Sequence, residues 1–430
     1  MAQPGVTYTA YGVGQKPIIM GSPENGADAS KWELVSGTDN IYRYSTPLKD
    51  VGALILNGSS FAARLCPHIK NGGYTFGYEK LANGQFISVV TDSSVSDKTN
   101  YGEYRDKAVN TVYFRCDEGN PGNVYNSIEF NTYGYVIGRT DAYDNGNYMN
   151  QNITVDNLDI RYAGGHGIGF SSAKNLTVSN CEVSWIGGSV MAINPDTDGQ
   201  GNSYYYASRY GNGVEVTGWC NGYTVQNCYI HDIYDAGITF QNGKTAYSTD
   251  REYNNVVWSG NLIENCCYST EYFASSSSNG TNKTTIKNVS IENNIMRNAG
   301  LGLCEQRISE DSETSDGKRG FNLGSHINSW YNAENISANF VIKNNVFDSC
   351  IYNDNARIKS GLLIICASVK GYLPTMSGNI YVQHYGANFA SFGVLNDALS
   401  LSWNAVFDIK AKGYAKAELG DVDCSVYYVD

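Results

Sequence analysis

The middle of the chain repeats one short pattern of apolar and polar positions. In "NITVDNLDI" and "NLTVSNCEV" an apolar residue is followed two positions later by Asn, and then, three positions further on, by a second apolar residue. A short link and a Gly-apolar pair usually follow. Copies of this pattern begin at Asn152, Asn175, Gly222, Val289 and Phe340, with a weaker copy at Val256. The chain is therefore built from repeating structural units in this region.

Alignment of the copies gives three columns. The first is Val155, Val178, Val225, Ile291 and Ile342; the second is Asn157, Asn180, Asn227, Asn293 and Asn344; the third is Ile160, Val183, Ile230, Met296 and Phe347. Such short strands cannot bury themselves singly, but they can when each coil of chain covers the next. Asn-Gly hairpin turns do not join successive copies, which argues against a sandwich or a propeller. The pattern predicts an all-β fold, a right-handed parallel β-helix.

We expect the regular coils to occupy residues 127–386. Residues 1–126 are predicted to form an N-terminal β segment with the first coil elements, and residues 387–430 an irregular β cap on the same solenoid. The Asn column fits sharp bends, because Asn tolerates unusual backbone dihedrals and its amide can bond to the Asn of neighbouring coils. Cys181 and Cys228 each follow an Asn of this column, so we expect them to stack as thiols rather than as a disulfide.

The composition agrees with this fold and argues against some classes of binding partner. The 46 Gly and 34 Tyr residues, with only 17% charged residues, are typical of an all-β chain with tight turns and an aromatic surface. A net charge of −12 argues against nucleic acid or an anionic membrane as a partner. No apolar run reaches the ~20 residues of a membrane span. The eleven cysteines lack metal-type spacing, so most are predicted to be buried thiols.

The repeats resemble those of the pectin-lyase-like superfamily, which includes pectate lyases, polygalacturonases and several glycosidase families. The segment "PGVTYTAYGVGQKPIIMGS" is similar to the N-terminal part of some β-helix glycosidases. This resemblance implies a polysaccharide or oligosaccharide substrate and an extracellular or cell-surface location. We also expect a monomer, and a leader or a first turn of structure trimmed from the start of this sequence. It indicates the substrate class more firmly than the reaction.

Insertions mark where a ligand site would lie. The repeat is interrupted after "WIGGS" by a Tyr-rich stretch and again at 243–253, 268–285 and 304–336. Since the interior of a β-helix is packed, we expect a ligand cleft on an outer face beside these loops. Aromatic rings pack against the C–H faces of sugars, so Tyr206 and Tyr210 are expected to contact a saccharide, unless the loop only packs on itself.

Carboxylates are the candidate catalytic groups. Alignment of "HGI", "NGV" and "AGI" points Glu215 outward, and Asp235 precedes the next strand. Each also has a structural interpretation, a loop contact for Glu215 and a turn cap for Asp235. Straight strands would separate the two by ~14 Å, whereas glycosidase carboxyl pairs lie ~5 Å or ~6.5–9.5 Å apart. Glu305 and Glu271 are therefore kept as alternative partners.

The expected substrate-binding set also includes His166, Arg209, His231 and Gln241. The Gly-His-Gly motif around His166 is also found in polygalacturonases, but the order of the accompanying motifs differs here, so their residue roles are not transferred.

Two further functions remain open. A Ca²⁺-dependent uronate lyase would use Asp196 and Asp198 as ligands and Arg161 or Arg209 as the base, although no basic cluster accompanies them. A non-catalytic glycan-binding β-helix would have regular coils with few loops. Because carboxylates and tyrosines mark the expected cleft, the sequence favours a glycoside hydrolase that needs no cofactor.

Overall fold

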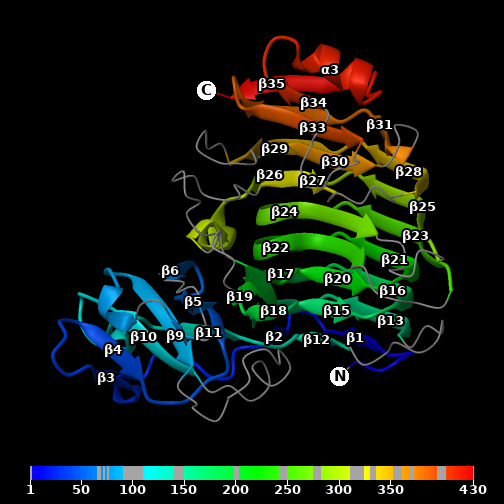
Figure 1. Cartoon of the computed structure of the whole chain (residues 1–430). Helices are drawn as coiled ribbons and strands as arrows, with labels where there is room; N and C mark the ends of the chain where they lie inside the picture. Colours follow the sequence, from blue (N-terminus) through cyan, green and yellow to red (C-terminus); the bar gives the residue numbers. More distant parts are fainter. Residues whose placement is uncertain are drawn as a thin grey trace.

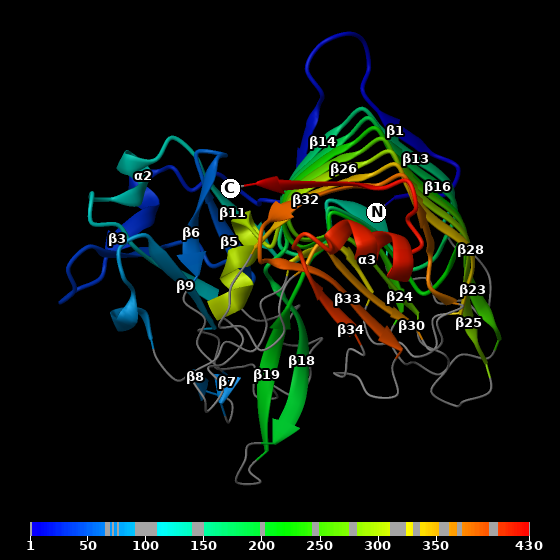
Figure 2. The same cartoon turned by 90° about the horizontal axis from the view of Figure 1, so that it is seen from above.

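The chain folds into a right-handed parallel β-helix with a smaller β domain packed on its side (Figure 1). The computed structural model describes residues 2–64, 69–70, 73–74, 77–90, 110–139, 150–197, 203–242, 249–274, 282–309, 324–329, 336–351, 361–367, 372–394 and 403–429. Seen along its axis, the helix shows its coils stacked into flat walls (Figure 2). The walls meet at sharp bends.

Three walls of parallel strands make up the solenoid. The first wall contains β1 (Thr7–Thr9), β13 (Gln151–Asp156), β16 (Ala173–Ser179), β21 (Cys220–Gln226), β23 (Arg251–Ser259), β25 (Thr284–Glu292), β28 (Ile336–Lys343) and β31 (Thr375–Ser377). The second contains β2 (Ile18–Met20), β14 (Asp159–Ala163), β17 (Glu182–Ile186), the first halves of β22 (Tyr229–Asn242) and β24 (Leu262–Ala274), β26 (Ile295–Ala299), β29 (Val346–Cys350), β32 (Ile380–His384) and β35 (Ser425–Val429).

The third wall carries the region of interest for function. It contains β12 (Ile137–Arg139), β15 (Ile168–Phe170), β20 (Val214–Thr217), the second halves of β22 and β24, β27 (Ser325–Asn328), β30 (Leu363–Ala367) and β33 (Asn388–Val394). Strand β34 (Trp403–Val406) pairs antiparallel with β33 at the end of this wall. β22 and β24 each continue from the second wall into the third, so those coils turn without a loop.

The strand register confirms the apolar columns. Val155 pairs with Val178 and Val178 with Val225 in the first wall. Ile160, Val183 and Ile230 pair in the same way in the second wall. All of these side chains are buried in one continuous core, because alternate residues of each strand point into the solenoid.

The Asn column occupies left-handed bends between the first and second walls. Asn157, Asn180, Asn227, Asn293 and Asn344 have φ values between 52° and 57°. This region of backbone space is unfavourable for most residues but accessible to Asn. The bend prediction is confirmed.

The stacked amides belong to the residue after the bend. Its side chain points inward, whereas that of Asn180 bonds to Asp156 near the surface. The buried ladder consists of Asn261, Asn294, Asn345 and Asn379 and ends at Asp421. Each Asn donates its backbone N–H and its Nδ2 to the side-chain oxygen of the next member, at 2.8–3.3 Å. Cys181 and Cys228 occupy the ladder position on the two coils before Asn261 and are free buried thiols, as expected. The backbone N–H of Cys228 donates to the side-chain oxygen of Asn261.

A seven-stranded sheet forms the N-terminal domain. Its order is β11 (Ile128–Thr132), β5 (Val51–Leu56), β6 (Ser60–Arg64), β9 (Gln85–Val90), β10 (Asn110–Arg115), β4 (Ile41–Tyr44) and β3 (Trp32–Leu34). Aromatic side chains, including Trp32, Tyr44 and Phe114, fill a core of its own. Before this domain, β1 and β2 pair with β13 and β14 and form a coil of the solenoid.

The C-terminal end continues the coils and then closes them. β33 pairs with β30 and β35 with β32, both in parallel. Between them, helix α3 (Ala411–Glu418) lies over the end of the stack (Figure 1) and buries Ala411 and Ala415 in the solenoid core. The expected cap of irregular strands thus includes a helix. Small alanines allow this helix to approach the last coil closely.

Candidate functional site

A row of buried polar side chains runs across the outer face of the third wall. Strand register places Gly169, Glu215, Thr239, Glu271 and Asn328 side by side on successive coils. Their neighbours Val214 and Val216 point into the core, so the row points outward. Yet Glu215 is only 2% exposed and Glu271 only 3%. We call these five positions the outer polar row.

Three donors hold the carboxylate of Glu215. Oε2 lies 2.7 Å from His166 Nδ1 and accepts a hydrogen bond from Asn212 Nδ2 at 2.9 Å. Oε1 accepts a hydrogen bond from Gln241 Nε2 at 3.0 Å. Burial raises the pKa of Glu215, but the attraction of His166 and these hydrogen bonds outweigh it and leave the pKa below its ordinary value. Glu215 is therefore an anion at neutral pH.

The His166 ring is fixed by aromatic neighbours. Tyr135 meets it edge-on with ring centroids 4.7 Å apart, and the Tyr210 ring lies 6.3 Å away. The backbone N–H of Asn212 donates a hydrogen bond to Nδ1 at 2.9 Å, and the same nitrogen lies 2.7 Å from Glu215 Oε2. Nδ1 can hold one proton or one lone pair. Nδ1 therefore lies between a backbone donor and the Glu215 carboxylate.

Asn212 links this site to the next coil. Its Oδ1 accepts a hydrogen bond from the backbone N–H of Ala236 at 2.9 Å, while its Nδ2 donates to Glu215. Asp235, which directly precedes Ala236, lies where β22 shifts register between Ile233 and Ala236 and is 8% exposed. It therefore lies at the bend that leads into the third wall.

Glu271 lies two coils beyond Glu215 in the outer polar row. Its Oε1 accepts a hydrogen bond from Asn328 Nδ2 at 3.0 Å. Between the two acids, the buried hydroxyl of Thr239 has no hydrogen-bond partner within the described part of the chain, and neither has Asn328 Oδ1. Two coils separate the Glu215 and Glu271 backbones by roughly 9–10 Å. The row thus combines two carboxylates with two buried polar atoms that have no hydrogen-bond partner among the described residues.

Glu305 lies apart from this row. It is an exposed residue of the 3₁₀ helix η3 (Gly302–Ser309), and its Oε2 accepts the backbone N–H of Gly302 at 3.2 Å. The structure therefore places it as a helix-end residue.

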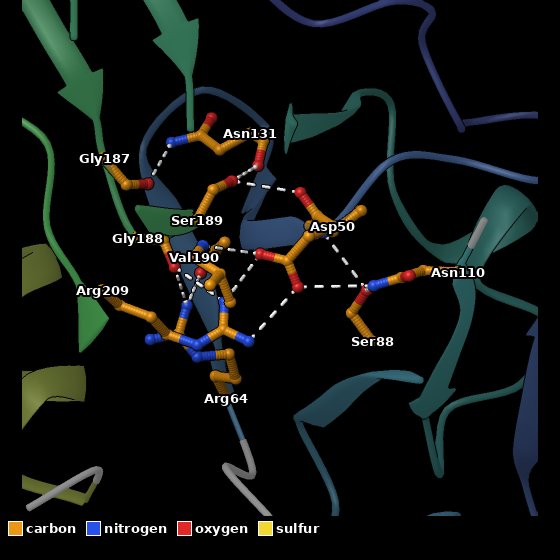
Figure 3. Close-up of polar contacts among 12 residues, drawn as sticks. Asp50, Arg64, Ser88, Asn110, Asn131, Gly187, Gly188, Ser189, Val190 and Arg209 are labelled. Carbon is orange, nitrogen blue, oxygen red and sulfur yellow. Dashed lines mark hydrogen bonds and ion pairs between the residues drawn. The ribbon is translucent and has the colours of Figure 1, made fainter. Parts of the chain in front are cut away.

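Arg209 joins the N-terminal domain to the solenoid. Nη1 and Nη2 donate to the two carboxylate oxygens of Asp50 at 2.8 and 3.2 Å, and Nη1 also donates to the carbonyl of Gly188 (Figure 3). Arg64 donates to the same Gly188 carbonyl at 2.7 Å and to the hydroxyl of Tyr234 at 3.0 Å. Arg209 thus serves the domain interface.

The other expected tyrosine lies in a hairpin. Tyr206 belongs to β19 (Ser203–Arg209), which pairs antiparallel with β18 (Val190–Thr197) and projects from the solenoid (Figure 2). The Tyr206 side chain lies outside the described residues. Tyr210, directly after β19, reaches the His166 ring.

His231 lies on the outer face of the second wall, away from the outer polar row. Its Nδ1 is 2.8 Å from Asp232 Oδ2, its Nε2 is 3.5 Å from Glu182 Oε1, and its ring stacks on Tyr229. Arg161 lies on the same face and pairs with Asp159 and Glu182. These groups form a network of polar contacts on the solenoid surface, in which Arg161 makes the ion pairs.

The structure therefore brings together three of the expected residues, His166, Glu215 and Gln241, with Tyr210 beside them. Sequence reasoning missed Asn212 and Tyr135. The signal for Asn212 was present, because alignment of "HGI" with "NGV" puts Asn212 directly over His166.

No group of three or more His, Cys, Asp or Glu side chains among the described residues is arranged to hold a metal ion. Of the two proposed calcium ligands, the Asp196 side chain and all of Asp198 lie outside that part of the chain. Among the described helices, none is long and apolar enough to cross a membrane.

Comparison with family models, with curated proteins and with solved structures gives no match. The fold is therefore established by its strand pairing, and the functional argument depends on the site itself.

Proposed function

We propose that the chain is a glycoside hydrolase that acts on a polysaccharide or oligosaccharide at the outer polar row. The observation that carries this proposal is the pairing of Glu215 with Glu271, two outward carboxylates on one row and two coils apart. Carboxylates are seldom buried without a purpose, since burial disfavours the charged form. Glycoside hydrolysis uses such a pair as general acid and base.

The spacing favours inversion of the anomeric centre. Inverting glycosidases hold their carboxyl groups ~6.5–9.5 Å apart, which leaves room for a water molecule between sugar and base. Two coils correspond to roughly 9–10 Å between backbones, and a modest tilt of the side chains reaches the inverting range. Thr239, whose buried hydroxyl has no hydrogen-bond partner among the described residues, lies on the coil between the two acids.

The two carboxylates take different roles. Three donors keep Glu215 ionised, so we assign it as the general base, which accepts a proton from water. Glu271 is then the acid that protonates the leaving oxygen. Tyr135 and Tyr210, beside the same site, offer ring faces to a sugar.

The lyase alternative is less well supported. A lyase needs a basic side chain near the uronate, but Arg209 is paired with Asp50, and Arg161 with Asp159 and Glu182. Consistent with a hydrolase, we further propose membership of the pectin-lyase-like superfamily and an extracellular or cell-surface location.

The test compares the wild type with Glu215→Gln, Glu271→Gln and Asp235→Asn on a panel of plant and host polysaccharides. Glu305→Gln is the matched control, because this exposed glutamate lies off the row. We expect new reducing ends with the wild type and the control, and a loss of roughly 10²–10⁴-fold for Glu215→Gln and Glu271→Gln. Ultraviolet absorbance of an unsaturated product would instead identify a lyase. Binding without any product would identify a glycan-binding protein.

A further inference from the structure

We propose that the ring of Tyr135 is the sugar-binding platform of this site and that the site takes an uncharged saccharide. This inference deepens the proposed function and rests on it for the place where the ligand lies. Binding can be measured without cleavage, so the two proposals can fail separately.

Three glycines make room for the Tyr135 ring on the outer face of the third wall. Gly138 pairs with Gly169, and Gly169 with Glu215, so both glycines lie in line with the outer polar row. A Cβ atom on Gly138 would lie 2.9 Å from Cδ2 of Tyr135, and one on Gly169 would lie 2.9 Å from Cε2. A Cβ atom on Gly165 would lie 3.1 Å from Cδ1. A side chain at Gly138 or Gly169 would therefore compete with the ring for this space.

The Tyr135 ring is held in place and keeps an exposed part. His166 meets the ring edge-on, with the ring centroids 4.7 Å apart. Tyr135 is nevertheless only half-buried. Because the wall covers the side of the ring that faces Gly138 and Gly169, the exposed part faces outward. An aromatic ring presented in this way is suited to pack against the C–H face of a sugar.

The ring lies in line with the two carboxylates of the proposed reaction. It covers the coils of β12 and β15, Glu215 follows on β20, and Glu271 lies two coils further on. Successive coils are about 4.8 Å apart. A saccharide that packs on Tyr135 and extends along the outer polar row therefore reaches Glu215 first and then Glu271.

The charges along this line favour an uncharged ligand. Glu215 is an anion, and Glu271 lies on the same row. The next outward positions on the same strands are uncharged: Thr217, Gln241 and Phe273. His166, the basic side chain beside the row, already contacts Glu215 at 2.7 Å. A uronate or a sulfated sugar would place its negative charge beside these carboxylates, which disfavours its binding.

The first experiment determines the ligand class. The wild-type full chain is screened in the cold, which slows turnover, on an array of neutral, uronate-containing and sulfated glycans. We expect binding to neutral glycans and none to the acidic ones. Binding of acidic glycans, or of no glycan on the array, would overturn the proposal.

The second experiment tests the platform by isothermal titration calorimetry with the neutral oligosaccharide that binds best. All variants carry Glu271→Gln, which blocks the proposed cleavage. Tyr135→Ala should weaken binding about tenfold, whereas Tyr135→Phe keeps the ring and should bind as before. Tyr11→Ala is the matched control, because Tyr11 is fully exposed on the link between β1 and β2. Unchanged affinity in Tyr135→Ala would overturn the platform.

Gly169→Ala tests the position of the ring while the tyrosine is kept. Its methyl group occupies the space of the ring, so this variant should also weaken binding. Combined with Tyr135→Ala, it should cause no further loss, because both changes remove the same contact. Additive losses would show that Gly169 acts on something other than the ring. Failure of the hydrolase proposal looks different: neutral glycans then bind with the same dependence on Tyr135, but the wild type releases no reducing ends.

Discussion

Arg209 and Asp50 are 159 positions apart in the sequence and form a two-pronged ion pair at the junction of the two parts of the molecule. Both side chains are nearly buried, and Asp50 also accepts the backbone N–H of Val190 at 2.8 Å. The pair therefore ties the start of strand β5 to the base of the β18–β19 hairpin (Figure 3). An arginine that looked like a substrate ligand in the sequence holds the N-terminal domain against the solenoid.

Removal of one partner of this pair should destabilise the protein strongly. Arg209→Gln leaves the buried carboxylate of Asp50 without its cation, which typically costs about 3–5 kcal/mol. Urea unfolding measures the change. The matched control is Arg43→Gln, since Arg43 pairs with Glu33 at an exposed site and should contribute no more than about 1 kcal/mol. Equal effects at the two sites would show that the interface pair has no special role.

The Asn ladder should be sensitive at a single position. Asn294→Ala removes an amide that accepts from Asn261 and donates to Asn345 and to the carbonyl of Trp258. Unsatisfied buried polar groups cost about 1–3 kcal/mol each, so we expect a loss of at least about 3 kcal/mol in the free energy of unfolding. Asn254→Ala, a half-buried amide on an outer face, should cost under about 1 kcal/mol. Comparable losses would contradict a structural role for the ladder.

Stability should fall with acid partly through Glu215. The folded protein holds the pKa of Glu215 below its ordinary value, so the ionised form is favoured by folding. This contribution is present above the unfolded pKa of about 4.3 and is lost as the pH falls through the lower folded pKa. The difference in unfolding free energy between wild type and Glu215→Gln should therefore be largest near neutral pH and narrow below about pH 4. A difference that stays constant with pH would refute this linkage.

The buried thiols should resist modification in the native state. Nine cysteines among the described residues are free and buried. Alkylation of the native protein followed by mass spectrometric mapping should leave these nine unlabelled, whereas labelling in urea should modify all of them. Rapid native labelling of Cys181 or Cys228, or a peptide linked through both, would disprove their packing as stacked thiols.

The sequence predicted the solenoid well because its signal is repeated and local. Val155 and Ile160 recur with the same spacing in every copy, and each left-handed bend needs a residue such as Asn157. One strand pairing is enough to set the register of the next. The inward amide ladder was missed because its position comes one residue after the recognised Asn column. In two of the copies this position is occupied by cysteine instead of asparagine.

The candidate site was predicted only in part. The outward direction of Glu215 followed from alternation along a strand, and His166 was singled out by its motif. The role of Arg209 depends on Asp50, which lies in a domain with no repeat to align, so no local pattern could reveal it. The sequence could not choose between Glu271 and Glu305 as the partner of Glu215. Only the pairing of β22 with β24 shows that Glu271 shares a row with Glu215.

The Asn ladder also has a direction. Between the side chains of the ladder, every amide donates to the next member toward the C-terminal end and accepts from the previous one, and each also donates to a backbone carbonyl of the coil before it, so each internal link is interchangeable with the next. Asp421 is different, because a carboxylate accepts hydrogen bonds without having to donate one, and it receives the last amide together with the hydroxyl of Tyr381. Whole coils could therefore be added or removed along the ladder without leaving a donor unmatched, provided that the final position keeps an acceptor. The ladder therefore permits solenoids with different numbers of coils, and Asp421 is the acceptor that ends it in this chain.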